Sequence, residues 1–198
     1  MFFGQPGATT ASVVAFWVVF YTWIGLEMWL GFRRRRLPSG ATDHDAGSKS
    51  WLIGSIWSTA AVGIGSAFAF PDAAISGDRT QVFITGLVLM IAGLALRWYS
   101  IWALGSSFTC DVTTRPGQEV VQSGPYRWIR HPSYTGGLLT VLGMLVCCCN
   151  FASLAALVLA AAGYAYRIRV EERALAANLG PPYRDYMQRT KRLIPFLI

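Results

Sequence analysis

Three long apolar runs constrain the fold of this chain more than any other feature of its sequence. They extend from Ala11 to Phe32, from Trp51 to Phe70 and from Val82 to Trp102. Each is close to the ~20 residues that an α-helix needs to cross the hydrocarbon core of a bilayer. Only 14% of the residues are charged, well below the quarter or so that is usual in soluble domains. The sequence therefore predicts helices that span a membrane.

Two shorter apolar runs follow, Ser133 to Cys149 and Phe151 to Tyr166, separated by Asn150. We interpret them as a helical hairpin whose second arm continues as helix past Arg167 into water. One span over both runs would be too long for an ordinary bilayer. We therefore expect an all-α, polytopic integral membrane protein with about five transmembrane helices, the last two forming a helical hairpin, and a cytosolic carboxyl-terminal helical tail. The expected unit is a single membrane domain over residues 1–198, in which residues 1–80 hold the first two spans and a basic loop.

The positive charge of the chain, formally +7, lies beside the apolar runs. Four arginines at residues 33–36 follow the first run, and most other basic residues lie in the loop 103–132 or after residue 166. Because Lys and Arg concentrate in cytoplasmic loops, we expect the amino terminus outside and residues 103–132 and 167–198 in the cytoplasm. We expect the inner (plasma) membrane of a prokaryote as the location. This placement argues against a nucleic-acid partner, which would require a basic face on a soluble fold.

The four cysteines do not predict a metal site. Cys147, Cys148 and Cys149 are contiguous and Cys110 is remote, so none of them has the spacing of metal ligands. We interpret them as small packing residues.

The stretch from Gly124 to Gly136 combines aromatic hydroxyls, arginines and a histidine at the start of an apolar run. Pro132 disfavours helical backbone at His131 and can itself occupy the first turn of a helix. The free amides of that turn suit a carboxylate or phosphate, and Arg130 adds a planar fork of donors. The alternative is that Arg130 only reaches the lipid phosphates as a basic residue at a span end.

Glu171 and Glu172 are adjacent in a charged segment after the last apolar run. Neighbouring residues lie ~100° apart around a helix, so one carboxylate can face inward while the other faces solvent or an arginine. An inward carboxylate above apolar helices suits a ligand cation. The alternative is a solvated charged face.

Other polar residues extend this candidate site. Tyr183 and Tyr186 are spaced to share one face of a helix, where they would cover a ligand or form an interfacial aromatic belt. Glu27 and Arg97 are ionisable residues inside predicted spans, so each either reaches the interface or lines a substrate cavity.

These motifs, taken in order, resemble the isoprenylcysteine carboxyl methyltransferase family, to which membrane phospholipid methyltransferases are related. The resemblance covers roughly residues 95 to 198 and rests on five blocks: Gly124-Pro125-Tyr126, Arg130-His131-Pro132-Ser133-Tyr134-Thr135-Gly136, Glu171-Glu172, Gly180-Pro181-Pro182-Tyr183 and Arg192-Leu193-Ile194-Pro195. The first two spans carry no such signature.

The resemblance implies an integral membrane methyltransferase that uses S-adenosylmethionine, with residues 95–198 as the cofactor-binding core. It implies that the cofactor pocket is formed by Gly124, Tyr126, His131, Pro132, Tyr134, Gly136, Glu171, Glu172 and Tyr183. One of the two glutamates would meet the cofactor's ammonium group. Arg130 and Glu172 are the expected catalytic residues, and Arg97, Arg130 and Glu27 the expected residues for the acceptor.

The acceptor is expected to be lipophilic and to enter from the bilayer, with a carboxylate favoured because it needs no general base. A thiol or a phospholipid amine remains as an alternative acceptor, and membrane lipid is the other expected partner. The sequence makes no prediction of the oligomeric state. A reductase of the sterol type, using NADPH, is the alternative from another class. Such enzymes usually carry Tyr-x-Gly-Glu where this chain has Tyr134-Thr135-Gly136-Gly137.

Overall fold

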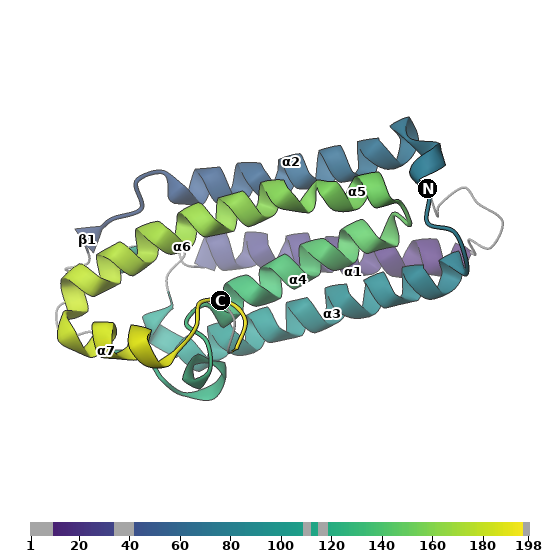
Figure 1. Ribbon diagram of the computed structural model, residues 1–198. Coiled ribbons are helices and arrows are strands. Elements are labelled where there is room, and N and C mark those ends of the chain that lie inside the picture. Colours follow the sequence, from purple (N-terminus) through teal and green to yellow (C-terminus); the bar gives the residue numbers. More distant parts are fainter. Residues whose placement is uncertain (1–9, 34–41, 109–111, 115–118, 196–198) are drawn as a thin grey trace.

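The computed structural model describes residues 10–33, 42–108, 112–114 and 119–195. Its elements, in chain order, are α1 (Thr10–Arg33), β1 (Thr42–Asp43), α2 (Ser48–Ala69), η2 (Pro71–Ala73), α3 (Arg79–Leu104), η3 (Gly105–Ser107), β2 (Thr113–Thr114), η4 (Gly124–Arg127), α4 (Pro132–Cys147), α5 (Phe151–Ala155), α6 (Leu157–Leu179) and α7 (Pro181–Arg189). The long helices run side by side (Figure 1). The two short strands pair antiparallel, and the described residues also contain two isolated bridges, Ala74 with Asn150 and Ile129 with Lys191.

The predicted spans are confirmed, and so is the polytopic helical fold. Helices α1, α2 and α3, and the combined helix Phe151–Leu179, are long and apolar enough to cross a membrane, and α4 is a shorter apolar helix. The second arm of the predicted hairpin continues as helix well past Arg167. The tail is helical in α7, although its cytosolic position remains a prediction.

The hairpin between α4 and α5 turns at Cys149 and Asn150. Cys149 has a positive φ of 51°, which is uncommon for a residue with a side chain. Asn150 then caps α5 by accepting hydrogen bonds from the amides of Ala152 and Ser153. Its Nδ2 donates to the carbonyl oxygen of Phe70 at 2.8 Å. The same side chain therefore starts the last span and ties it to the end of α2.

Helices α3 and α4 pack at very short range through glycines. A Cβ atom added at Gly136 would lie 2.6 Å from the backbone nitrogen of Arg97, and one at Gly93 would lie 2.5 Å from the nitrogen of Thr140. Small residues allow this approach between helices in a membrane, where dispersion contacts replace the hydrophobic effect. The contact brings Arg97 against the first turn of α4.

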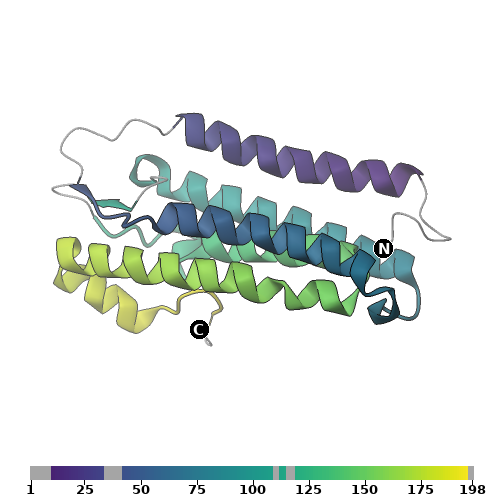
Figure 2. The same ribbon diagram turned by 90° about the horizontal axis from the view of Figure 1, so that it is seen from above.

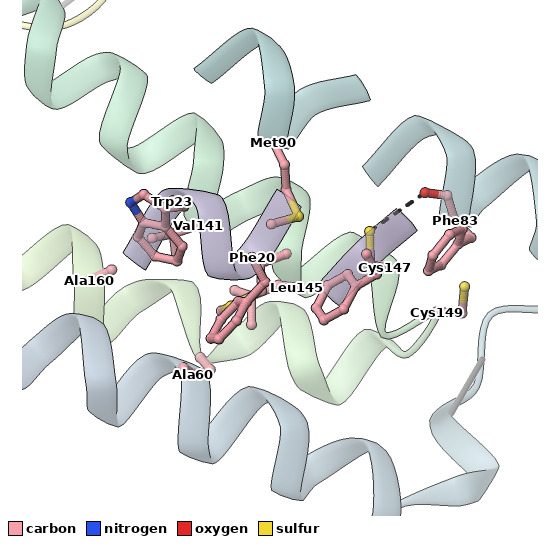
Figure 3. Packing of buried hydrophobic residues seen from close by; sticks show 13 residues of the cluster. Phe20, Trp23, Ala60, Phe83, Met90, Val141, Leu145, Cys147, Cys149 and Ala160 are labelled. Atoms are coloured by element: carbon pink, nitrogen blue, oxygen red, sulfur yellow. Dashed lines mark hydrogen bonds between the residues drawn. The ribbon is translucent and has the colours of Figure 1, made fainter. Parts of the chain in front are cut away.

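The apolar core fills the space between α1, α3, α4 and the α2–α6 pair. Phe20, Phe83, Met90 and Leu145 are buried in it (Figure 3). The sulfur of Cys147 lies 3.6 Å from the carbonyl oxygen of Phe83. The three contiguous cysteines are buried, in keeping with their interpretation as packing residues, whereas Cys110 lies outside the described residues.

The polar segments meet at one end of the bundle, where α3 ends and α4 begins, together with α7 and β1 (Figure 1). Helix α1 lies at one edge of the bundle, with α3 as its main helical partner (Figure 2). This arrangement leaves a space between α1 and α2 that contributes to the site described next.

Candidate functional site: two cavities that meet

A polar cavity lies at this end of the bundle, between the loop before α4, the second half of α6 and α7. Its lining combines aromatic, charged and apolar side chains. The lining includes Phe108, Tyr126, Arg130, His131, Ser133, Tyr134, Arg167, Glu171, Leu175, Leu179, Tyr183 and Tyr186.

Glu172 is buried behind this cavity as the centre of an ionic cluster. Its Oε1 accepts from Nε of Arg130 at 2.8 Å and lies 3.3 Å from Nε2 of His131. Its Oε2 accepts from Nε of Arg192 at 3.0 Å. This carboxylate is 4% exposed, so removing its charge would leave Arg130 without its buried partner, which is costly.

Arg130 fastens the tail to the start of α4. Besides its bond to Glu172, its Nη1 donates to the carbonyl oxygens of Met187, at 3.0 Å, and Thr190. Its backbone nitrogen donates to the carbonyl oxygen of Lys191 at 2.8 Å. The tail after α7 is therefore a strap held by both the backbone and the side chain of Arg130.

Glu171, unlike its neighbour, lines the cavity. Its Oε2 accepts from the hydroxyl of Tyr134 at 2.7 Å and lies 3.8 Å from Nδ1 of His131. Its side chain is 29% exposed, against 5% for that of Glu172. Of the two adjacent carboxylates, Glu171 is thus the one available to a cation in the cavity.

Tyr134 connects the groups around the cavity. Its ring stacks on that of His131, with centroids 5.4 Å apart and planes 9° apart. Its hydroxyl accepts from Nε of Arg167 at 3.3 Å while donating to Glu171. Arg167 in turn pairs with Asp45, in the segment before α2. One hydroxyl therefore lies between a carboxylate and a guanidinium.

The two tyrosines of α7 line the cavity on the side of the carboxyl-terminal tail. Tyr183 and Tyr186 are both 3% exposed. The hydroxyl of Tyr186 donates to the carbonyl oxygen of Tyr126 at 2.6 Å. Burial raises the pKa of Tyr186 to about 12, and burial also raises the pKa of Tyr183, so both hydroxyls stay neutral in the physiological range.

A second, apolar cavity of about 330 Å³ lies between α1, α2, the carboxyl-terminal half of α3, the first turn of α4 and the middle of α6. That volume is within the range of small-molecule sites. The lining is mostly aliphatic and aromatic, with charged groups at one end, and includes Phe20, Trp23, Glu27, Lys49, Leu52, Ile56, Trp57, Arg97, Phe108, Tyr134, Tyr164 and Arg167.

An ion pair joins α1 to α3 in this apolar cavity. Arg97 binds Glu27 through two nitrogens, and Nη2 to Oε2 is 2.7 Å. Nη1 of Arg97 donates to Oγ of Ser133 at 3.0 Å, in the first turn of α4. The two intramembrane charges are thus partners, and both line a cavity.

The two cavities share Phe108, Tyr134 and Arg167 in their walls. A ligand in the polar cavity and a ligand in the apolar cavity would therefore lie on either side of these three side chains.

The residues expected at the site divide into three groups. Tyr126, Arg130, His131, Tyr134, Glu171 and Tyr183 line the polar cavity, and Glu27 and Arg97 line the apolar one. Among the described residues that line the polar cavity, Gly124, Pro132, Gly136 and Glu172 do not appear. Pro132 begins α4, Gly124 begins η4 with a φ of 56°, and Gly136 lies against α3.

Sequence reasoning missed Arg167 and, apart from Glu27, the contribution of the first two spans. Arg167 is not among the expected site residues, but it is 4% exposed and lines both cavities. Its position directly after the apolar run that ends at Tyr166 could have indicated that Arg167 is buried. Helices α1 and α2 carry no motif because an apolar wall requires only hydrophobic residues.

Fold and site together define an integral membrane protein in which a polar cavity at one end of the helices adjoins an apolar cavity between them. The sequence model of the "Isoprenylcysteine carboxyl methyltransferase (ICMT) family" matches residues 86–177. The resemblance predicted from the motifs is thereby confirmed.

Individual relatives agree with this match. Protein-S-isoprenylcysteine O-methyltransferase B of Arabidopsis thaliana is 36% identical over 115 residues, which cover 57% of this chain and 58% of that protein. Protein-S-isoprenylcysteine O-methyltransferase of Homo sapiens is 31% identical over 122 residues, covering 60% and 43%. The chain therefore spans about half the length of these curated relatives.

A solved structure shares the fold. The eukaryotic intramembrane Ras methyltransferase ICMT superposes with a TM-score of 0.58 at 26% sequence identity, over 77% of this chain and 53% of that one. The match extends beyond the segment that carries the motifs, so the helical arrangement is shared more widely than the recognisable sequence.

Proposed function

We propose that this protein is a membrane methyltransferase that transfers a methyl group from S-adenosylmethionine to the carboxylate of a lipophilic, isoprenylcysteine-like acceptor. The observation that carries the proposal is that Phe108, Tyr134 and Arg167 line both the polar and the apolar cavity. A water-soluble donor and a membrane-soluble acceptor need two such compartments with one point of contact.

The polar cavity suits an adenosyl cofactor. Glu171 offers a partly exposed carboxylate for an ammonium group. Tyr126 and Tyr183 offer rings and neutral hydroxyls, and Leu175 and Leu179 offer apolar surface for a base. The cofactor would supply an activated methyl group, so the protein has to position the reactants and exclude water.

The transfer step needs no acid or base from the protein. An oxygen of the acceptor carboxylate attacks the methyl carbon opposite the sulfur. The carbon–sulfur bond breaks, its electron pair stays on sulfur, and a neutral methyl ester and a neutral thioether result. Tyr134 and Arg167, at the contact between the cavities, would orient the oxygen and balance its charge.

The charges in the apolar cavity favour an anionic acceptor. Three cations and one carboxylate line it: Lys49, Arg97, Arg167 and Glu27. Counting Asp45, which pairs with Arg167 from outside the cavity, still leaves the cations in excess. A phospholipid amine or a neutral thiol would gain less from this surplus than a carboxylate.

The proposed topology follows from the basic loops. The polar cavity would face the cytoplasm, because the arginines flank that end of the bundle. The acceptor would enter sideways from the bilayer, and a prokaryotic inner membrane remains the proposed location.

The deciding experiment is methyl transfer by the purified protein in lipid nanodiscs. We expect the labelled methyl group of S-adenosylmethionine to appear on N-acetyl-S-farnesylcysteine, in a product that releases labelled methanol in base. The control is the same acceptor with its carboxylate converted to an amide. Base-stable label on a thiol or amine acceptor would change the acceptor class. Binding of NADPH without binding of S-adenosylhomocysteine would overturn the methyltransferase assignment.

A further inference from the structure

The ion pair between Glu27 and Arg97 has two unequal halves. Arg97 is fixed on α3 and is held from a second side by Ser133 of α4. Its side chain is 14% exposed, whereas that of Glu27 is 31% exposed. Glu27 extends from α1, the helix at the edge of the bundle. The arginine is therefore the fixed partner, and the carboxylate is the exchangeable one.

The pair also lies where the head of an acceptor would arrive. Both residues line the apolar cavity, together with Tyr134 and Arg167 at its contact with the polar cavity. An acid with a long apolar tail along α1 and α2 would place its carboxylate at this charged end. Glu27 presents the same chemical group to the same guanidinium.

A guanidinium inside a membrane needs an anionic partner when no ligand is bound. Glu27 supplies this partner. Only another carboxylate, from this chain or from a ligand, can replace it without leaving the guanidinium unpaired. An incoming carboxylate can take the place of Glu27 and keep Arg97 paired, whereas a neutral acceptor cannot take that place.

We propose that Glu27 is an internal placeholder for the acceptor's carboxylate, displaced from Arg97 when the acceptor binds. This inference rests on the proposed function and assigns the anion site of the acceptor to Arg97. It makes Glu27 a specificity residue, since only an anionic acceptor competes with it. After transfer, the neutral ester no longer binds the guanidinium, so Glu27 returns and favours release of the product. Glu27 lies outside residues 86–177, so the feature is not part of the segment that matches the family.

The test compares the binding of a carboxylate and of its amide to variants of the full chain in nanodiscs. The probes are N-acetyl-S-farnesylcysteine and its carboxamide, titrated with S-adenosylhomocysteine present. We expect Glu27→Gln to bind the carboxylate about tenfold more tightly than the wild type, because a charged competitor is removed. The affinity for the carboxamide should not change. Arg97→Gln should lose binding of the carboxylate and keep binding of the carboxamide.

Asp72→Asn is the matched control, because it removes an exposed carboxylate at the opposite end of the bundle. Glu27→Ala is a second variant without the charge, should the glutamine variant fold poorly. Binding of S-adenosylhomocysteine reports on the fold of each variant. Equal or weaker binding of the carboxylate by both Glu27 variants would overturn the placeholder role, and so would equal tightening for both probes.

Failure of the proposed function gives a different result. In that case the wild type itself would bind neither the adenosyl ligand nor the carboxylate, or would bind both without forming an ester.

Discussion

Nε of Arg130 lies 2.8 Å from Oε1 of Glu172, which joins two segments 42 residues apart in the chain. The bond connects the start of α4 to the middle of α6, and Arg130 continues to the carbonyl oxygen of Met187. Three segments that carry the family's motifs are thus held around one buried ion pair. The pair shapes the polar cavity from behind, while Glu171 faces into it.

The first prediction concerns the two adjacent glutamates. Glu172→Gln removes the charge that balances Arg130 and Arg192, so we expect a loss of about 3 kcal/mol in stability and a lower Tm. Glu171→Gln is the matched control, because it changes the next carboxylate. It should leave the Tm nearly unchanged and weaken binding of S-adenosylhomocysteine. Thermal unfolding and calorimetric titration measure the two effects, and a reversed pattern would contradict the assignment.

The second prediction concerns the hydroxyl of Tyr134. Tyr134→Phe keeps the ring that stacks on His131 but removes the bridge between Glu171 and Arg167. We expect binding of the adenosyl ligand to weaken about tenfold, as a lost hydrogen bond to a charged group implies. Tyr166→Phe, in the half-exposed outer part of α6, should change binding little. Equal affinities for the wild type and Tyr134→Phe would place the cofactor elsewhere.

The third prediction concerns the contact between α3 and α4. Gly136→Ala places a methyl group 2.6 Å from the backbone of Arg97, so the helices must separate. We expect destabilisation of about 2 kcal/mol. Gly54→Ala meets nothing within 4 Å on α2 and should stabilise the protein slightly, since alanine is the better helix former. Unfolding in detergent by chemical denaturant compares the two variants. A neutral Gly136→Ala would mean that the helices pack less tightly than described.

The fourth prediction concerns pH and the pair between Asp45 and Arg167. Burial alone would raise the pKa of Asp45, but the Lys49 amide and the Arg167 guanidinium outweigh it and lower that pKa. A carboxyl with a lowered pKa contributes stability above its unfolded value of about 3.9, and loses that contribution as the pH falls through its folded value. We therefore expect the loss of Tm caused by Asp45→Asn to be the same at pH 8 and pH 5.5. If Asp45→Asn lowers the Tm at pH 8 but no longer lowers it at pH 5.5, the pKa of Asp45 is not lowered.

Local sequence determined the helices and their ends. Apolar runs of span length, Pro132 at a first turn and Asn150 as a cap act within a few residues, so the hairpin and the spans were predictable. The basic residues in the segments 103–132 and 167–198 also predicted that the polar residues of both segments lie at the same end of the bundle. The motifs themselves identified six residues that line the polar cavity: Tyr126, Arg130, His131, Tyr134, Glu171 and Tyr183.

Only the tertiary structure decided which face each helix turns toward its neighbours. Glu171 and Glu172 have the same side chain and adjacent positions, so their ~100° separation around α6 could not show which one meets Arg130. Gly136 has a packing role because α3 lies against it, and Arg167 is buried because Asp45 and Tyr134 surround it. Helices α1 and α2 form the apolar wall with no motif at all. Rotation of a helix about its own axis changes its local free energy little. The packing of segments distant in the chain therefore decides which face of the helix is buried.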